Sequence, residues 1–545
     1  MERNTLRTAI VFAGFVALTV LPLLGNAYLF DWDEVNFAEC AREMLVSGDY
    51  LHPQIEFEPF WEKPPLFFWL QAAAMHVFGV NEFAARFPNA LVGIATVVLL
   101  VIVGTRWLDR QFGMVWALLW IGSLLPQFYM HSGLIDPLFN LLMFSSLVAA
   151  LTSLESSQRY WWLAGSGLLL GCAVLTKGPV ALLLVGLPLV VLWTISLGWK
   201  RMLADGMLIL LLSALPFVVW LFSDQSQYGQ WFMRSFVEYQ VRLLTTGDAG
   251  HSGPIYYHLV VLLAGCFPAS WLALAGLRPA WRVALLQRQS FAMALMLATV
   301  VVMFSIVQTK IVHYSSLAYY PLTFFGAQVL YRWRQQPRQR FPLVIAMVGT
   351  AIVGVTMILT PVILANRDLL LSLVRDEFSR SIIETTTPHW KGIEWSAGAL
   401  ALIAMLGAIA LARRLPRAAI VAVLVGLALS VSAFLRIVAP RIQDFTQRRV
   451  VEFCKRYSTS DAIIHPIGFK TYLHLFYAKR RRERSPRGLG VARPQWEAYL
   501  LDGKLPCDVI FLAKRTKAID LLRRTDLVPL DDPNLPWLFL LRAHK

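Results

Sequence analysis

The chain has 545 residues, of which 57% are hydrophobic and only 15% are charged. A soluble globular protein carries roughly 45–50% apolar and about 25% charged residues, so this composition excludes an ordinary soluble protein and indicates an integral membrane protein. The formal net charge is +16, which fits Lys and Arg in cytoplasmic loops. Nucleic acid is not an expected partner, because no basic stretch interleaves with a folded soluble module before the C-terminus.

Apolar segments of about 20 residues, the length that a helix needs to cross a bilayer, recur along the chain. The first follows Arg3 and Arg7 and resembles a signal peptide, but it lacks a small-residue cleavage site and many spans follow it, so we expect it to be retained. The segment 66–78 is shorter and suits an interfacial or re-entrant helix. The expected spans, about 13 in number, are 8–26, 87–105, 112–130, 134–153, 161–176, 178–197, 203–222, 255–276, 289–307, 314–331, 342–364, 395–412 and 418–437.

Loop charges orient these spans, because short loops rich in Lys and Arg stay in the cytoplasm. With the N-terminus inside, the outer segments are 27–86, 131–133, 177, 223–254, 308–313 and 365–394. Counting 66–78 as a span would move the strongest basic clusters outside. We therefore expect a multi-pass protein of the bacterial inner membrane, with a transmembrane domain over 1–438 and a periplasmic C-terminus.

Residues 439–545 contain no span and are predicted to form a small soluble α/β domain in the periplasm. Its basic character begins at Lys479 and fits either a solvated face or contact with anionic lipid head groups. Cys454 and Cys507 lie in this domain, where an oxidising periplasm would permit a disulfide. The apolar runs that carry the prediction are Ala462–Ile464, Thr471–Phe476 and Val509–Ala513, separated by charged stretches such as Arg448–Arg456.

Polar side chains gather at the outer ends of the spans. Charges at membrane depth are costly and usually mark a functional site or a buried pair. Loop charges, and not these side chains, set the topology, so their common side predicts a single outer-facing site. The side chains are Asp33 and Glu34 after the first span, Glu62 and Lys63 before the short helix, and Asp136, Lys177, His251, Lys310, His313 and Tyr314 farther along.

Two carboxylates and several cations at an outer membrane surface suit an anionic donor that is linked to lipid. A phosphate leaving group needs stabilisation by Lys, Arg or a metal ion. A hydroxyl nucleophile needs a carboxylate within hydrogen-bond reach to take its proton. Because the outer face has no ATP, an energy-rich donor must arrive there attached to lipid. This chemistry predicts transfer of a group from a polyprenyl phosphate.

The order of the motifs resembles the C-type membrane glycosyltransferases. The similarity is greatest to the bacterial branch that contains the aminoarabinose transferase of lipid A, which is related to protein O-mannosyltransferases. It covers roughly residues 5–440 and implies an all-α polytopic membrane fold, with about 13 spans and a small periplasmic C-terminal domain. The residues that carry it are the acidic pair after the first span, Glu62-Lys63-Pro64-Pro65, Asn81–Pro88, Asp136 at the start of a span, Thr176-Lys177-Gly178-Pro179 and Lys310–Tyr314.

The resemblance implies a role for individual residues. Asp33 is expected to be the catalytic base or an acceptor-positioning carboxylate, and Asp136 the second catalytic aspartate. Glu62 is expected to hold a divalent ion (Zn, Mg or Mn), with His251 as the candidate second ligand, although the motif around His251 differs from that of the aminoarabinose transferase. The residues expected to bind the donor phosphate are Lys63, Lys177, Arg242, Lys310 and Tyr314. The phosphate-binding arginine of the family has no clear counterpart in this sequence, and Arg242 is the candidate for that role.

Each candidate also has a structural interpretation. Asp33 or Glu34 could cap a helix over 35–46, and Asp31 could compete with Asp33 for the role of base. The other structural interpretations are an ion pair between Glu62 and Lys63, a buried pair between Asp136 and a lysine, a snorkelling Lys177, a hydrogen-bonded loop residue at His251, and interfacial belt positions for His313 and Tyr314.

The sequence thus predicts a monomeric membrane glycosyltransferase that moves a sugar from a polyprenyl-phosphate donor to a hydroxyl or phosphate acceptor, with a lipid A-like glycolipid favoured over a protein. The alternative is a polytopic transporter or lipid flippase, in which intramembrane charges, internal repeats and broken helices would be expected. A polymerase or ligase of whole lipid-linked glycans would share the topology. Such an enzyme tends to have a large arginine-bearing outer loop, whereas 224–253 holds only Arg234 and Arg242.

Overall fold

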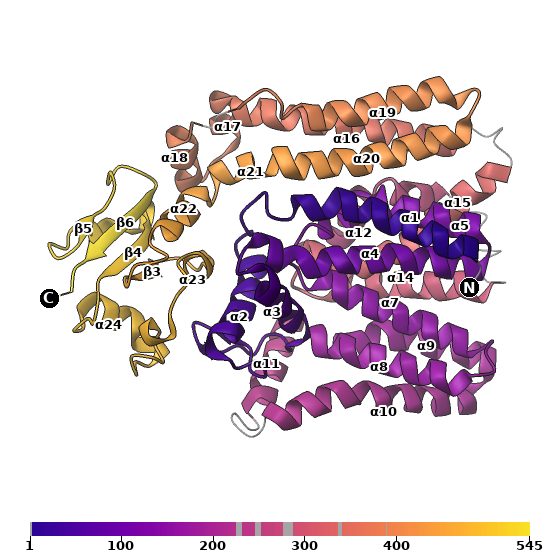
Figure 1. The fold of residues 1–545 in the computed structure, drawn as a ribbon, viewed down its shortest axis with the longest axis horizontal. Helices are drawn as coiled ribbons and strands as arrows, with labels where there is room; N and C mark the ends of the chain where they lie inside the picture. Colours follow the sequence, from indigo (N-terminus) through magenta and orange to yellow (C-terminus); the bar gives the residue numbers. More distant parts are fainter. Residues whose placement is uncertain are drawn as a thin grey trace.

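The computed structural model describes residues 3–224, 231–245, 252–275, 287–335, 341–387 and 390–544. These residues form a long bundle of roughly parallel helices with a small α/β domain at one end (Figure 1). The N-terminus lies at the far end of the bundle and the C-terminus lies in the α/β domain (Figure 1). Opposite positions of the two termini are what an odd number of membrane crossings requires.

Every predicted span falls on a helix or a broken pair of helices. The predicted span 112–130 divides into α5 and α6, and the predicted span 255–276 becomes α12 and Ala269–Ala275, which are bent by 105°. The helices of the bundle are α1 (Arg3–Val20), α4 (Glu82–Trp107), α5 (Arg110–Ile121), α6 (Leu124–Tyr129), α7 (Asp136–Ser153), α8 (Arg159–Lys177), α9 (Val180–Leu197), α10 (Trp199–Asp224), α12 (Tyr257–Gly265), α14 (Arg288–Ile306), α15 (Tyr319–Gln335), α16 (Phe341–Ala365), α19 (Ser396–Ala412) and α20 (Pro416–Ile437).

Among the described residues, eight helices are long and apolar enough to cross a membrane, and a ninth span arises if the bent pair counts as one. The other predicted spans coincide with α5–α6, α8, α15 and α19, which are shorter or less apolar. The protein is therefore an all-α polytopic membrane protein over most of its length, as predicted.

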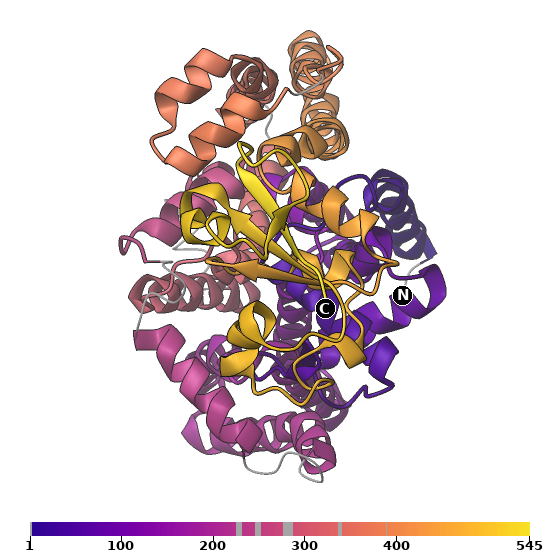
Figure 2. The same ribbon diagram turned by 90° about the vertical axis from the view of Figure 1, so that its left-hand side faces the viewer.

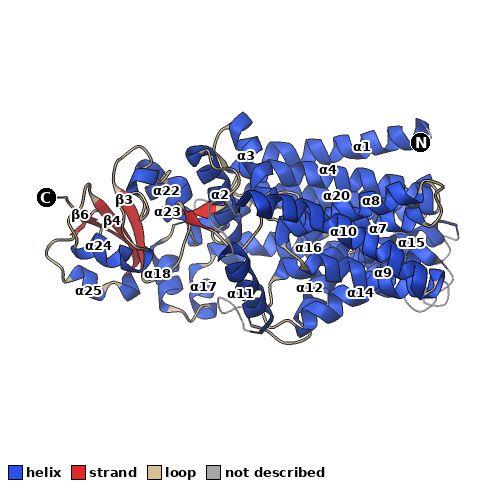
Figure 3. Ribbon diagram, turned by 90° about the horizontal axis from the view of Figure 1, so that it is seen from below, coloured by secondary structure: helices blue, strands red, loops and turns tan. Residues whose placement is uncertain are grey.

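The first outer loop folds into α2 (Asp33–Ser47), the hairpin β1 (Gln54–Ile55) and β2 (Glu58–Pro59), and α3 (Leu66–Phe78). Helix α3 has the predicted bounds and is too short to cross the bilayer. Further outer helices, α11 (Trp231–Thr245), α17 (Arg367–Leu373) and α18 (Glu377–Thr385), lie at the same end of the bundle as α2 and α3 (Figures 1 and 3).

The C-terminal domain has a four-stranded sheet in the order β3-β4-β6-β5, in which β3 and β4 are parallel and the other pairs are antiparallel. The predicted small α/β domain is thereby confirmed. Viewed along the bundle, it sits in front of the helix ends (Figure 2). Its strands are β3 (Ile463–Ile467), β4 (Val509–Lys514), β5 (Val528–Pro529) and β6 (Trp537–Arg542). Helix α21 (Ala439–Ile442) connects the bundle to the domain, whose own helices are α22 (Arg448–Arg456), α23 (Leu473–Tyr477), α24 (Trp496–Asp502) and α25 (Ile519–Leu522).

The two faces of this sheet belong to different hydrophobic cores. One face packs with α22 and α23 and with apolar side chains of the first outer loop, including Phe37 and Phe67. The other face packs against α24. Cys454 lies in the first core and Cys507 in the second, and both are free thiols. The disulfide that an oxidising periplasm would permit is not formed, because the sheet separates the two side chains.

Buried charges also join α2 to the C-terminal domain. Arg42 donates two hydrogen bonds of 2.6 Å to Glu39 and one of 3.0 Å to the carbonyl oxygen of Arg480. The Arg480 guanidinium lies 3.4 Å from Glu56 in the hairpin. Removing one partner of such a buried network costs about 3–5 kcal/mol, because a charge is left unpaired. The network therefore fixes the orientation of α2 relative to the domain.

Candidate active site

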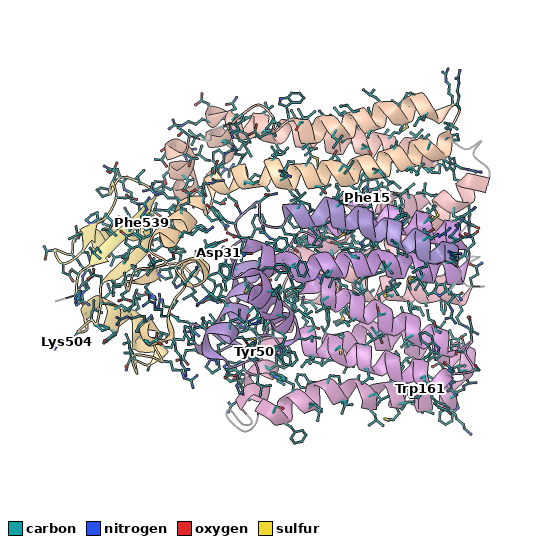
Figure 4. The ribbon with its side chains drawn as sticks, viewed as in Figure 1. Phe15, Asp31, Tyr50, Trp161, Lys504 and Phe539 are labelled. Atoms are coloured by element: carbon teal, nitrogen blue, oxygen red, sulfur yellow. The ribbon has the colours of Figure 1, made fainter. Side chains whose placement is uncertain are left out.

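A cavity of about 650 Å³ lies where the first outer loop, the bundle and the C-terminal domain meet. Asp33, the first residue of helix α2, lies at the edge of this cavity, and 45% of its side chain is exposed. Asp31, which also lines the cavity, is labelled in Figure 4 at the junction of the bundle and the C-terminal domain. Other lining residues come from six separate parts of the chain, including Lys63, Ser132, Lys177, Tyr239, His313 and Lys470.

Glu34, the neighbour of Asp33, is a buried anchor. It forms a two-point ion pair with Arg86 of α4, at 2.8 and 2.9 Å, and also accepts hydrogen bonds from the backbone N–H groups of Phe30 and Gly133. A Cβ atom at Gly133 would lie 3.1 Å from Cγ of Glu34, so a larger residue would crowd the pair. Glu34 thus fastens α2 to α4, which is stronger than the predicted capping role, and leaves Asp33 facing the cavity.

Asp31 is held by backbone groups on both sides. Its carboxylate accepts hydrogen bonds from the N–H groups of Trp32, at 2.9 Å, and Tyr472, at 3.2 Å. Burial raises the pKa of Asp31. Because its oxygen atom ties the first loop to the C-terminal domain, Asp31 is a poorer candidate for the base than the exposed Asp33. Trp32, between the two carboxylates, has a φ of 73°, a backbone conformation that costs a bulky residue roughly 1–3 kcal/mol.

Lys63 is a buried cation at the cavity wall. Its Nζ donates to the Tyr239 hydroxyl at 3.1 Å and lies 4.7 Å from the centre of that ring. Burial alone would lower the pKa of Lys63, but the neighbouring oxygens of Tyr239 and Glu62 outweigh it and raise the pKa above the ordinary value. Tyr239 was not predicted. It lies three residues before Arg242 on α11, so both face the cavity, and Arg242 stacks 5.3 Å from its ring.

Asp136 and Lys177 form a buried ion pair. Asp136 is the first residue of α7 and Lys177 is the last residue of α8, so the antiparallel packing of these helices brings the two ends together. Their side chains are only 4% and 13% exposed. The predicted structural alternative, a buried partnership of Asp136 with a lysine, is confirmed as a contact. Tyr314 covers the pair, with its ring centre 4.7 Å from Lys177 Nζ.

His313 faces both aspartates. Its Nε2 lies 3.5 Å from Oδ2 of Asp33 and 3.6 Å from Oδ2 of Asp136. Burial lowers the pKa of His313, so the ring is neutral near pH 7. The sequence places His313 on the outer side but assigns it no role, because nothing in the local pattern shows which side chains its ring meets.

Lys310 corrects one prediction. Its Nζ donates to the carbonyl oxygens of Phe304, Ser305 and Val307, at 2.6–2.8 Å, at the C-terminal end of α14. All three ammonium hydrogens are therefore used to cap that helix end, where carbonyl groups lack intrahelical partners. Lys310 is a structural cation and not a ligand of the donor phosphate.

The predicted metal site has one described member. Glu62 lines the cavity beside Lys63, whereas His251 lies outside the described residues. Within the part of the chain that the structure describes, no three His, Cys, Asp or Glu side chains come together as metal ligands. A single carboxylate is too few ligands to hold a divalent ion by itself.

A second cavity, of about 400 Å³, adjoins the first. It is lined mainly by apolar side chains of α7, α9 and α14, among them Leu183 and Phe304. The two cavities share Lys63, Lys177 and Tyr314 in their walls. An apolar groove and a polar chamber thus meet at two lysines, an arrangement that suits an amphipathic ligand with an anionic group between its two parts.

Parts of the chain are similar in sequence to known proteins. Residues 62–220 match the family model described as dolichyl-phosphate-mannose-protein mannosyltransferase. A relative from Proteus mirabilis, undecaprenyl phosphate-alpha-4-amino-4-deoxy-L-arabinose arabinosyl transferase 2, is 29% identical over 285 residues, which are 50% of this chain and 50% of the relative. A transferase of the same description from Pseudomonas aeruginosa is 31% identical over 271 residues, or 48% and 49% of the two chains. These alignments span about half the length of the curated relatives.

Solved structures resemble the chain over its whole length. ArnT from Cupriavidus metallidurans bound to undecaprenyl phosphate superposes with a TM-score of 0.77 at 18% identity, covering 98% of each chain. The archaeal oligosaccharyltransferase AglB from Archaeoglobus fulgidus superposes with a TM-score of 0.53 at 9% identity, covering 94% of this chain and 69% of that one. The chain therefore has the fold of the C-type membrane glycosyltransferases. Its sequence is similar to aminoarabinose transferases over about half its length and to the protein mannosyltransferase family model over 62–220, which confirms the resemblance seen in the sequence.

Proposed function

We propose that this chain transfers a sugar from a polyprenyl-phosphate donor to an acceptor on the periplasmic side of the bacterial inner membrane. One observation carries the proposal: an apolar groove and a polar chamber meet at Lys63, Lys177 and Tyr314. The groove suits the polyprenyl chain, the lysines suit the phosphate, and the chamber suits the sugar and the acceptor.

The two lysines have different surroundings. Lys177 is paired with Asp136, so its charge is partly neutralised. Lys63 contacts a neutral phenol, that of Tyr239, and so keeps more of its charge for the phosphate. In a site shielded from water, such cations stabilise the negative charge that develops on a leaving phosphate.

Asp33 is placed to act on the acceptor. As a hydroxyl oxygen bonds to the anomeric carbon of the sugar, Asp33 takes the hydroxyl proton. The bond from that carbon to the phosphate oxygen breaks, and polyprenyl phosphate leaves with the electron pair. A phosphate acceptor is already ionised, and in that case Asp33 positions the acceptor instead of removing a proton.

The class of donor is inferred from the names of the relatives. We infer aminoarabinose or a similar sugar, because the relatives carry that sugar and undecaprenyl phosphate in their names. A lipid A-like glycolipid is the favoured acceptor and a protein hydroxyl the second. The C-terminal domain, which shares a core with the first outer loop, would lie in the periplasm, and the protein would act as a monomer.

A divalent ion (Zn, Mg or Mn) held by Glu62 and His251 is a separate proposal, and no step of the reaction depends on it. When bound beside the phosphate, such an ion would supply Lewis-acid stabilisation. Loss of activity on chelation, restored by a single divalent cation, would support it. Full activity in the presence of chelator would remove both residues from the ligand set.

A transporter is less well supported. The bent pair α12 and Ala269–Ala275 contains no Asp, Glu, Lys or Arg, whereas a transport pathway through a broken helix would be expected to carry acidic or basic side chains. The charged side chains of the cavity lie at the end of the bundle that meets the C-terminal domain.

The test is a transfer assay on purified protein in lipid nanodiscs, with labelled undecaprenyl-phosphate sugars and with lipid A or peptides as acceptors. We expect Asp33→Asn to lower kcat by roughly 100-fold or more, since general bases contribute about 10²–10⁴-fold. Lys63→Ala should lower both donor affinity and kcat. Lys504→Ala, at the far edge of the C-terminal domain (Figure 4), is the matched control and should behave as wild type. Full transfer by both Asp33→Asn and Lys63→Ala would show that the site is wrong.

A further inference from the structure

His313 occupies a fixed place between the two aspartates. It is the second residue of the 3₁₀ helix η3 (Val312–Ala318). Its carbonyl oxygen accepts a hydrogen bond from Ser316 Oγ, which in turn accepts one from Asn140 of α7 at 2.7 Å. Asn140 lies one helical turn after Asp136, so the same helix positions both the imidazole and one of the carboxylates that it faces.

The surroundings decide which ring nitrogen carries the hydrogen. Nε2 faces carboxylate oxygens of Asp33 and Asp136, at 3.5 and 3.6 Å. A lone pair on Nε2 would be repelled by both oxygens, so Nε2 carries the hydrogen and the neutral ring keeps its lone pair on Nδ1.

Neither contact is a closed hydrogen bond, because a bond of this kind needs a separation of about 2.7–3.2 Å. Oδ1 of Asp136 accepts from Lys177, whereas Oδ2 has no hydrogen-bond partner among the described residues. The ring therefore lies almost midway between two anionic oxygens, and a shift of about 0.5 Å would close either bond. Hydrogen bonds of catalytic groups commonly tighten in this way only when substrate binds.

We propose that His313 is a positioning residue for Asp33, donating its Nε2–H to Oδ2 of Asp33 in the substrate complex while Asp136 keeps the ring facing the cavity. The proposal rests on the proposed function, in which Asp33 is the base. Asp33 is half-exposed on the first residue of a helix, so without such a donor its carboxylate has several rotamers to choose from. Fixing Oδ2 leaves Oδ1 to face the acceptor.

The arrangement also responds to the state of the base. An N–H donor stabilises the ionised form of a carboxylate and so favours Asp33 as an acceptor of protons. Once Asp33 has taken the acceptor proton, it attracts the Nε2–H less than the still ionised Asp136 does. The imidazole hydrogen then turns to Asp136, and no proton leaves the ring. The charged and titratable groups that surround the ring in this exchange are Asp33, Lys63, Asp136, Lys177, the adjacent Tyr314 and, from α12, His258.

The activity test compares wild type with His313→Leu and His313→Gln in the transfer assay across pH. A hydrogen bond to a charged group is worth about 1.5–3 kcal/mol, so His313→Leu should lower kcat roughly 10- to 100-fold, with the donor KM little changed. The acidic limb of the kcat/KM profile should move to higher pH by about one unit, because the ionised base has lost its donor. His313→Gln, which keeps an N–H donor, should recover most of the activity. His76→Leu, at an exposed position on α3, is the control.

A second measurement needs no substrate. A double-mutant cycle on thermal unfolding with Asp33→Asn, His313→Leu and the double variant reports the coupling of the two side chains across their 3.5 Å contact. Non-additive effects would support the contact, and additive effects would overturn it. In the assay, an active His313→Leu variant with the wild-type pH profile would also overturn it. Absence of any transfer by wild type would refute the proposed function instead, and the unfolding cycle would still decide on the contact.

Discussion

Lys177 donates from Nζ to Oδ1 of Asp136, and this ion pair stands in the wall where the apolar groove meets the polar chamber. The pair gives the phosphate position an unequal set of charges. Asp136 partly neutralises Lys177, while Lys63, which precedes α3, donates a hydrogen bond to the phenol of Tyr239. Substitutions can therefore distinguish how each of these residues contributes to the charge at the phosphate position.

We expect the two single variants of this pair to have different effects on the donor KM. Lys177→Met leaves Asp136 as a buried, unpaired anion beside the phosphate, so stability should fall by about 3–5 kcal/mol and the donor KM should rise. Asp136→Asn leaves a lysine that the phosphate itself can pair, so the donor KM should stay the same or fall. The double variant Asp136→Asn/Lys177→Met should regain stability without regaining donor affinity.

Thermal unfolding and donor KM, measured on all four proteins, check this prediction. If the double variant binds donor as wild type does, Lys177 does not contact the phosphate and serves only to neutralise Asp136. If Asp136→Asn raises the donor KM as Lys177→Met does, the unequal roles of the two residues are wrong.

Much of the fold could be predicted because membrane spans are long and apolar. Segment 66–78 is the clearest case, since its length and the loop charges together distinguish a surface helix from a span, and α3 has those bounds. The position of Asp33 at the start of a helix also followed from the local sequence.

The partners of individual side chains could not be predicted in the same way. Lys310 caps α14 because the chain turns back there and presents three carbonyl oxygens, which no spacing of residue types reveals. Tyr239 reaches Lys63 across 176 residues of sequence, and Tyr472 binds Asp31 across 441 residues. Contacts of this kind are set by helix packing, so a list of polar residues on one side of the membrane contains both site residues and structural ones.

The groove offers a prediction about the donor lipid. Leu183 of α9 lines the groove and is 53% exposed, while Leu187, one turn farther along the same helix, is 50% exposed and lies outside the groove lining. Leu183→Trp should displace part of the polyprenyl chain. Each methylene that loses its contact costs about 0.8 kcal/mol, so the KM for an undecaprenyl donor should rise roughly 4- to 15-fold if one or two are displaced.

Leu187→Trp is the matched control for that variant, because it adds the same bulk to the same helix. We expect it to leave the donor KM unchanged. A donor with a short, water-soluble prenyl chain should be used equally well by wild type and by Leu183→Trp. A lower kcat with the undecaprenyl donor at an unchanged KM would place the polyprenyl chain elsewhere.

The docked C-terminal domain should be sensitive to acid through His474. This side chain is buried in α23, and burial, Arg480 and His465 lower its pKa well below the ordinary value. In the unfolded chain a histidine titrates near pH 6.5. Between that pH and the lower folded pKa the unfolded state binds more protons, so the stabilising contribution of neutral His474 is present above about pH 6.5 and is lost as the pH falls below it.

Thermal unfolding of wild type and His474→Gln isolates the contribution of His474 to the pH dependence of stability. The measurements run from about pH 7.5 to about pH 5, a range that brackets the titration of an unfolded histidine. Glu43 opposes it in both proteins, since burial raises its pKa and a protonated Glu43 stabilises the fold at lower pH. The difference between the two proteins removes that shared contribution. We expect the unfolding midpoint of wild type to fall more steeply on acidification than that of His474→Gln, by roughly 2–4 °C for each kcal/mol lost. His76→Gln, at an exposed position on α3, should keep the wild-type slope. Equal slopes for wild type and His474→Gln would contradict the prediction, because they would show that protonation of His474 does not destabilise the folded protein.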